Sequence, residues 1–317
     1  MKSLVSICLV VLSAPVPARA FPPLDRASPV VQESTQATRA PEALFFEAFW
    51  YDQGVNDPAR ALRLYEAFLD QHGKHEYAGR AARRAYDLLV RIKESERAEA
   101  FKKQHEALIT SVKPGINSTF LDPKLKVETF VERFEGESRE IFLHRGKILA
   151  LMQLTEGMHV ADVGAGTGLF TFPMSQKVGS DGRVYAVEIS DGMIEHLGKE
   201  KLRRQRDNVH VVACTERSTK LAPNSVDLVF VCDTYHHFEY PVETLASIHD
   251  ALRDKGQLVI VDFERIPGKS REWTLGHVRA GKEEVRKEIE AAGFRFVREE
   301  QTPLVENYYV RFEKVAR

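Results

Sequence analysis

VADVGAGTGLF, residues 160–170, is a short apolar run that passes directly into glycines at every second position. The run predicts a buried strand over residues 159–163, and a helical pattern resumes over residues 168–177. Glycines let the backbone turn sharply and approach a ligand closely, and the start of the following helix offers free N–H groups. The stretch therefore predicts a strand, a ligand-binding loop and a helix.

The spacing of the glycines restricts the class of ligand. A dinucleotide-binding loop would have its third glycine at position 169, where this chain has Leu169, so the spacing argues against NAD. Asp162, just ahead of the loop, would repel phosphate but suits an ammonium or sulfonium group. Glu188 ends the next strand, where a carboxylate can accept hydrogen bonds from both hydroxyls of a ribose; the alternative is a solvated acid at the end of a strand.

Outward from this unit, strand-like runs alternate with helical patterns, which is typical of βαβ units in a parallel sheet covered on both faces. The predicted strands after 159–163 are 183–188, 209–213, 226–231, 257–262, 294–300 and 307–314. The last two are close enough in sequence to pair as an antiparallel hairpin. The predicted helices are 126–153, 168–177, 191–206, 241–253 and 282–292. The fold class is α/β, with seven strands in a doubly wound sheet that ends in the hairpin.

The first twenty residues have the three parts of a secretory signal. Lys2 supplies the positive charge, residues 4–14 the apolar run, and Ala18-Arg19-Ala20 the small-x-small cleavage pattern. The apolar run is well under the roughly twenty residues that span a bilayer, so no stable membrane span is expected. We expect export to the periplasm or medium, with membrane tethering if the segment stays uncleaved and a cytoplasmic enzyme if the start is misassigned.

Three further segments precede the α/β domain, which we assign to residues 126–317. Residues 21–41 are rich in Pro, Ser, Thr and Ala and predict a flexible spacer, and residues 110–125 predict a linker. Between them, residues 42–109 predict a small all-α domain with helices at 42–52, 58–71, 76–92 and 95–109. It resembles tetratricopeptide repeats, although its repeat distance of 39 exceeds their usual 34. The region is either a surface for a protein partner or a helical appendage packed on the main domain.

Charge and composition exclude several function classes. Lys and Arg number 45 against 46 Asp and Glu, a net charge of −1, so no basic field would draw the protein onto nucleic acid or an anionic membrane. With 43% hydrophobic residues in 317, the chain is neither disordered nor a miniprotein held by disulfides. A globular protein that handles a small-molecule substrate is expected.

Residues 126–315 resemble a class I S-adenosylmethionine-dependent methyltransferase of the broad small-molecule, type 11-like group. The resemblance rests on VADVGAGTGLF, VYAVEIS (184–190), LAPNSVDLVFVCDTYHHF (221–238) and LRDKGQLVIVDF (252–263). It implies a Rossmann-like sheet with strand order 3-2-1-4-5-7-6 and S-adenosyl-L-methionine as cofactor. The cofactor contacts it implies are Asp162 at the amino group, Gly164, Ala165, Gly166, Thr167 and Gly168 around the methionine moiety, Glu188 at the ribose, and Ile189 and Thr215 at the adenine.

The candidate catalytic residues follow the fourth predicted strand. His236, His237 and Asp233 lie in a loop that faces the donor in similar enzymes, and each could serve as general base or substrate contact. The alternative is that they form a pocket wall without an acid–base role. A metal site built from these three residues is conceivable, but nothing else in the sequence completes it, so we expect none.

Three further groups of residues matter for function. Two groups are candidates for substrate contacts, and the two cysteines bear on the compartment in which the protein works. Arg133, Glu140 and Arg145 could reach the methionine carboxylate or the acceptor, and Trp273, His277 and Arg279, in a long connection, could contribute to the acceptor site. Cys214 and Cys232 end strands that the implied order separates by two others, over about 10 Å, so both are expected to be free thiols. Free thiols and a need for S-adenosylmethionine both conflict with an oxidising destination.

The function that the sequence predicts is methyl transfer by in-line displacement to a small-molecule acceptor whose O, N, S or C nucleophile the sequence does not identify. The alternative is a non-catalytic S-adenosylmethionine-binding or scaffold protein that uses its helical domain to bind a partner. The intact glycine loop and Glu188 favour the enzyme.

Overall fold

The computed structural model describes residues 40–75, 77–136 and 139–315 of the chain. The predicted signal peptide lies outside the described residues, and so does the predicted spacer except for its last two residues. Within the described part, no helix combines the length and the apolar character that a membrane crossing requires.

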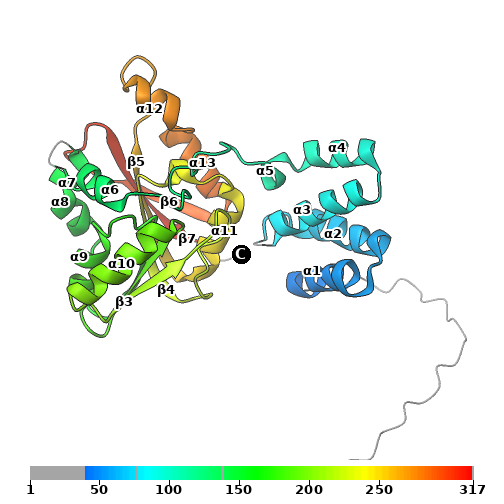
Figure 1. Ribbon diagram of the computed structural model, residues 1–317, viewed down its shortest axis with the longest axis horizontal. Coiled ribbons are helices and arrows are strands. Elements are labelled where there is room, and N and C mark those ends of the chain that lie inside the picture. Colours follow the sequence, from blue (N-terminus) through cyan, green and yellow to red (C-terminus); the bar gives the residue numbers. More distant parts are fainter. Residues whose placement is uncertain (1–39, 76, 137–138, 316–317) are drawn as a thin grey trace, which may run out of the picture. The chain divides into compact units, whose positions relative to one another are not determined.

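A seven-stranded sheet forms the centre of the α/β part of the chain, between residues 159 and 314 (Figure 1). Its strands are β1 (His159–Val163), β2 (Arg183–Glu188), β3 (Val209–Ala213), β4 (Val226–Cys232), β5 (Leu252–Phe263), β6 (Phe294–Glu299) and β7 (Asn307–Lys314). The order is β3-β2-β1-β4-β5-β7-β6, in which β1 to β5 pair in parallel and β7 pairs antiparallel with both β5 and β6. The predicted fold, hairpin and strand order are confirmed.

Side chains of β4 show how the sheet divides the core. Val229 and Val231 belong to one cluster of buried residues, whereas Leu228 and Phe230 belong to another. Because neighbouring side chains of a strand point to opposite faces, both faces of the sheet are buried. The covering helices include α9 (Thr171–Val178), α10 (Asp191–Arg203), α11 (Pro241–Ala251) and α13 (Lys282–Ala291). Each fully buried aliphatic side chain here contributes roughly 1.5–3 kcal/mol.

The predicted single helix 126–153 is wrong. The structure has three shorter helices, α6 (Val127–Phe134), α7 (Glu140–Leu143) and α8 (Arg145–Leu151). Gly136, a poor helix former, follows the first, and Arg139 is extended, with φ −99° and ψ 120°. The connection after β5 also contains a helix that was not predicted, α12 (Glu272–His277), and a short 3-10 helix, η2 (Tyr235–His237), follows β4.

The amino-terminal helical region has its own buried cluster. It contains α1 (Pro41–Phe49), the π-helix η1 (Trp50–Val55), α2 (Pro58–His72), α3 (Ala78–Arg91), α4 (Ser95–Gln104) and α5 (Glu106–Ile109). Ala61 and Phe68 are fully buried, whereas Ala100 and Ala107, their equivalents 39 residues later, are exposed. The likeness to tetratricopeptide repeats therefore stays a prediction.

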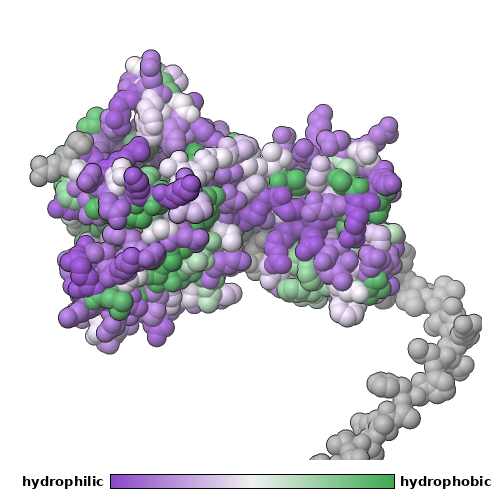
Figure 2. Space-filling view, in the orientation of Figure 1, coloured by the Kyte–Doolittle hydropathy of each residue, from purple (hydrophilic) through white to green (hydrophobic). Residues whose placement is uncertain are grey.

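The face of the molecule drawn in Figure 2 is largely hydrophilic, with hydrophobic residues in small scattered groups. This agrees with a chain in which 29% of residues are charged. Isolated exposed hydrophobic residues of this kind are normal on a protein surface.

Candidate active site

A cavity of about 620 Å³ lies at the carboxyl ends of the parallel strands. The residues that line it include Val163 at the end of β1, Glu188 at the end of β2, Cys214 after β3, Cys232 at the end of β4 and Phe263 at the end of β5. Ligands of open α/β sheets bind at this edge, where the strand order reverses. The cavity is also within the usual size range of small-molecule sites.

Most of the residues predicted to bind a cofactor or to act in catalysis line this cavity. They are Asp162, Gly164, Ala165, Gly166, Thr167, Glu188, Ile189, Thr215, Asp233, His236 and His237. Gly168 is not among the lining residues. Its φ is +88°, and a Cβ there would meet the Phe172 ring at 2.5 Å, so Gly168 serves the packing of the loop against α9.

Two other glycines of the loop need their special backbone conformation. Gly164 has φ +75°, and a Cβ there would meet the side chain of Thr234 at 2.3 Å. Gly166 has φ +53°, and the first atom that a Cβ would meet is a Phe134 ring carbon at 3.6 Å. A Cβ at Gly166 would make only ordinary van der Waals contact, so the positive φ rather than a clash favours glycine here, and the backbone of Gly166 lines the cavity beside the Phe134 ring.

Glu188 directs its carboxylate at the glycine loop. Its Oε2 accepts a hydrogen bond from Gly166 N at 2.8 Å, and its Oε1 accepts from Ile189 N at 2.8 Å and Ser190 N at 3.0 Å. Burial raises the pKa of Glu188, and the three N–H groups partly offset this effect. A carboxylate has about four acceptor positions, so some capacity for a ligand hydroxyl remains.

Asp162 and Thr167 add two buried polar groups near the loop. Thr171 Oγ1 donates a hydrogen bond to Asp162 Oδ2 at 2.6 Å, and burial raises the pKa of Asp162 to about 7. Thr167 Oγ1 is buried and has no hydrogen-bond partner among the described residues. A buried hydroxyl without a partner is costly, so a water molecule or a polar ligand group within reach of it would stabilise the loop.

Asp233 is engaged by protein groups. It forms an ion pair with Arg139, and Asn307 Nδ2 donates a hydrogen bond to its Oδ1 at 2.5 Å. Burial raises the pKa of Asp233. Since one oxygen faces Arg139 and the other Asn307, we interpret Asp233 as a residue that holds Arg139 in the cavity wall rather than as a base. Sequence reasoning missed Arg139 and Asn307 because their pairing depends on the α7 and β7 positions.

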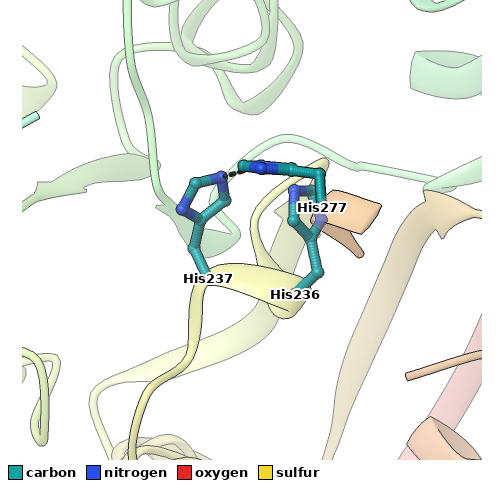
Figure 3. Close-up of side chains that lie close together, drawn as sticks. All are labelled: His236, His237 and His277. Atoms are coloured by element: carbon teal, nitrogen blue, oxygen red, sulfur yellow. Dashed lines mark hydrogen bonds between the residues drawn. The ribbon is translucent and has the colours of Figure 1, made fainter. Parts of the chain in front are cut away.

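His236 and His237 lie on η2 and meet His277 from the end of α12, as Figure 3 shows. His236 Nδ1 lies 2.7 Å from Asp262 Oδ1, and His237 Nδ1 lies 3.1 Å from Asn117 Oδ1. His237 Nε2 and His277 Nε2 are 3.4 Å apart. Asp262 and Asn117 were not among the residues predicted from the sequence.

Burial and neighbouring positive charge keep two of these histidines neutral. They lower the pKa of His237 to about 3 and that of His277 to about 4. A group with so low a pKa is a weak proton acceptor at neutral pH. This weighs against His237 as the general base that the sequence suggested.

Aromatic side chains form much of the remaining wall. Those that line the cavity include Phe120, Phe130, Phe134, Phe263 and Trp273. Trp273 stacks on His277 with ring centroids 4.6 Å apart, and Phe120 meets His237 edge to face at 5.4 Å. This part of the cavity suits an apolar, ring-containing molecule.

Other candidates fall in different places. Arg133 and Glu140 line the cavity, but Glu140 accepts hydrogen bonds from the backbone N–H groups of residues 305 and 306. Arg145 donates to Phe142 O, and Arg279 pairs with Glu288. Cys214 and Cys232 are free thiols, as expected.

Known proteins are similar to this part of the chain. A family profile described as "Methyltransferase domain" matches residues 161–260. A ubiquinone/menaquinone biosynthesis C-methyltransferase (UbiE) of Blochmanniella pennsylvanica is 33% identical over 109 residues, which are 34% of this chain and 42% of the relative. The aklanonic acid methyltransferase DauC of Streptomyces sp. strain C5 is 31% identical over 120 residues, 38% of this chain and 54% of the relative.

The chain thus spans about half the length of these curated relatives. Among solved structures, a SAM-dependent methyltransferase from Aquifex aeolicus matches with a TM-score of 0.54 and 26% identity, covering 61% of this chain and 100% of that one.

Proposed function

Because its second half is a class I S-adenosylmethionine-dependent methyltransferase domain, we propose that this chain transfers a methyl group from S-adenosylmethionine to a small, ring-containing acceptor. The observation that carries the proposal is that one and the same cavity, described above, combines two kinds of lining. It is lined both by the glycine loop with Glu188 and by aromatic and histidine side chains.

The residues present fit the cofactor. Gly166 leaves room for close approach, Glu188 keeps acceptor capacity, and the hydroxyl of Thr167 is buried without a partner among the described residues. In this proposal Glu188 binds the ribose hydroxyls, Asp162 attracts the positively charged methionine part, and Ile189 and Thr215 flank the adenine. These assignments follow the order of the strands, because Glu188 ends β2 and Thr215 follows β3 on the same side of β1.

When bound, S-adenosylmethionine supplies an electrophilic methyl group on a good leaving group. The protein's task is then to align the acceptor and to exclude water. Arg139, held by Asp233, together with Phe263 and Trp273 positions the acceptor on the β4 and β5 side of the cavity. A proton lost from the acceptor passes to solvent or to a nearby base.

The class of acceptor is proposed from the lining. Phe120, Phe130, Phe134, Phe263 and Trp273 provide flat apolar surfaces, while the net charge of −1 provides no attraction for nucleic acid. The two curated relatives are named for quinone biosynthesis and for aklanonic acid, which agrees with an acceptor that contains rings.

Calorimetry with S-adenosylmethionine tests the cofactor assignment. We expect Glu188→Ala to weaken binding at least tenfold, about 1.4 kcal/mol, because it removes the acceptor of the ribose hydroxyls. Glu195→Ala is the matched control, since that side chain lies on α10, is 70% exposed and is not a lining residue. Wild-type protein that does not bind, or equal affinities in the two variants, would contradict the proposal.

Turnover is then measured with labelled methyl donor and a panel of quinols and phenolic polycycles. Transfer to at least one ring compound supports the acceptor class. The protein could instead bind the cofactor and methylate an aliphatic amine or acid but no member of the panel. That result would support methyltransferase activity and reject a ring-containing acceptor.

A further inference from the structure

The three histidines at the cavity wall come from two separate segments of the chain. His236 and His237 belong to η2, and His277 ends α12 some forty residues later. One nitrogen from each ring lies within 4.8 Å of the other two, and Figure 3 shows the rings turned toward one another. From the sequence, a metal site was weighed only for Asp233, His236 and His237 and none was expected, whereas His277 was a candidate for the acceptor site.

We propose that His236, His237 and His277 form a mononuclear site for a divalent transition-metal ion of the zinc type, with one coordination position open to the cavity. Nothing in the family assignment requires this ion. The proposal rests on the geometry of the three imidazoles and on the groups that orient them.

The separation of the ligand atoms suits a tetrahedral ion. Zn–N distances of about 2.0–2.1 Å place two nitrogens of a tetrahedral site about 3.3 Å apart. His237 Nε2 and His277 Nε2 are 3.4 Å apart. All three ligand atoms lie within 4.8 Å of one another, so binding an ion would draw the remaining pairs closer by at most about 1.5 Å.

In two of the rings, the nitrogen that would not bind the ion is held by a hydrogen bond, as is usual for metal-binding histidines. His236 Nδ1 bonds Asp262, whose carboxylate also accepts hydrogen bonds from His236 N at 3.0 Å and Phe263 N at 2.7 Å. His237 Nδ1 bonds the side-chain oxygen of Asn117, whose Nδ2 donates to His237 O at 3.1 Å. Both contacts place the proton on Nδ1 and leave Nε2 free to bind an ion.

The ligand set selects the class of metal. Three imidazoles suit Zn²⁺ and related borderline ions, whereas Mg²⁺ and Ca²⁺ prefer oxygen ligands. Trp273, stacked on His277, and Phe263, 5.6 Å from His236, are apolar neighbours of the site, and Lys113 brings one positive charge close to it by donating to His277 O at 2.7 Å. Three protein ligands with one open position are typical of zinc sites that act on a bound molecule rather than of purely structural ones.

The open coordination position would allow the ion to bind the methyl acceptor, and this role rests on the proposed function. His236 and His277 line the same cavity as the aromatic residues, so the ion can bind an oxygen, nitrogen or sulfur atom of the acceptor. Binding to the ion lowers the pKa of that atom's proton, so that the acceptor loses the proton to solvent and presents an electron pair to the methyl group.

The test measures metal binding without any turnover. The full chain is stripped with a chelator and titrated with Zn²⁺ and with Co²⁺, whose visible absorption reports four-coordinate geometry. We expect one ion per chain and an intense four-coordinate Co²⁺ spectrum. His277→Ala should weaken binding by more than about 100-fold, because loss of an orienting group alone costs 10–100-fold.

His196→Ala on α10 is the matched control, and Asn117→Ala and Asp262→Asn are the variants of the orienting groups. Each orienting variant should weaken Zn²⁺ binding about 10–100-fold. Circular dichroism identifies any variant that fails to fold. If wild-type protein takes up no ion, or if His277→Ala binds as tightly as His196→Ala, the site is rejected.

Calorimetry with S-adenosylmethionine on the same samples separates the two proposals. Retained S-adenosylmethionine binding in His277→Ala, together with lost Zn²⁺ binding, supports a distinct metal site. Zn²⁺ binding in a wild-type protein that does not bind S-adenosylmethionine would reject the proposed function and leave the metal site standing.

Discussion

Asp162 is a carboxyl group buried at the end of β1, and its protonation should affect the stability of the ligand-free protein. Burial raises its pKa from 3.8 to about 7. Between these values the folded state holds a proton that the unfolded chain has lost. The free energy of unfolding therefore falls as pH rises from about 4 to about 7. At about 1.4 kcal/mol per pKa unit, the effect is a few kcal/mol at most.

Urea unfolding of wild type and Asp162→Asn at pH 5 and pH 8 checks this prediction. The variant has no carboxyl group at this position, so its stability should fall less between the two pH values. Glu188 and Asp233, whose pKa values are also raised by burial, remain in both proteins, so the difference between the two slopes reports Asp162 together with its repulsion by Glu188. Identical pH dependence in the two proteins would show that Asp162 is already ionised at pH 5.

Two glycines should respond in opposite directions to the same substitution. Gly168→Ala requires φ +88° and brings its Cβ to 2.5 Å from the ring of Phe172, so we expect a loss of about 1–3 kcal/mol in the free energy of unfolding. Gly198 lies within α10 and a Cβ there meets nothing within 4 Å, so Gly198→Ala should stabilise by about 0.4–1 kcal/mol. Thermal and urea unfolding measure both. A neutral Gly168→Ala variant would mean that the loop relaxes freely.

Much of the cavity lining around the glycine loop could be predicted from single residues, because the loop and Glu188 are close to strands that periodicity identifies. The histidine site could not. A long connection separates His277 from His237 in the sequence, and Asn117 precedes His237 by more than a hundred residues. Their meeting depends on how α12 and the segment before α6 pack, and no local pattern encodes that packing.

Among the elements, α6 should be the part of the cavity wall that responds most to a ligand. None of its residues is fully buried, although Phe130 and Phe134 line the cavity and their rings are 5.5 Å apart. An element with few buried contacts opens easily. We expect amide exchange in Val127–Phe134 to slow by at least tenfold on addition of S-adenosylmethionine, as measured by hydrogen–deuterium exchange.

The strand β4 is the internal reference for that experiment, because its central residues are fully buried in the sheet. Its exchange should not change. Equal protection of α6 with and without ligand would indicate that the bound cofactor does not reach the rings of Phe130 and Phe134.

At the level of elements, strand bounds were easier to predict than helix bounds. The predicted limits of β1, β2, β3 and β7 agree with the structure, because each is a short apolar or alternating run between turn residues. The helix predicted at 126–153 failed for a physical reason. Its apolar spacing continues across Gly136 and Arg139, and periodicity alone does not detect an extended residue inside such a run.

At the scale of the whole molecule, the oxidation state of Cys214 and Cys232 tests both the strand order and the compartment of the protein. Cys214 and Cys232 lie at the ends of β3 and β4, and β2 and β1 separate these strands. Burial raises the pKa of Cys214 to about 12 and raises that of Cys232 well above its ordinary value. Both thiols should therefore react slowly with a disulfide reagent in the folded protein and remain unoxidised after purification in air.

The count of thiols after unfolding tests the proposed export. Protein recovered from its natural host should show two thiols per chain if the predicted signal has been removed, and three if Cys8 is retained. Intact mass measures the same difference. A Cys214–Cys232 disulfide would contradict the strand order, and three thiols would favour a tether or a cytoplasmic enzyme.

The contacts of residues 111–117 affect how the protein can be divided and recombined. Ser111 Oγ donates to Glu239 Oε2 at 2.6 Å, and Asn117 bonds His237. A gene fusion that joined a foreign domain at residue 126 would keep every strand of the sheet, yet it would discard the residue that orients one of the three histidines. The segment that must be kept together in a fusion is thus longer than the sheet and its helices. Replacement of the helical region preserves the contacts of Ser111 and Asn117 only if the junction lies before Ser111.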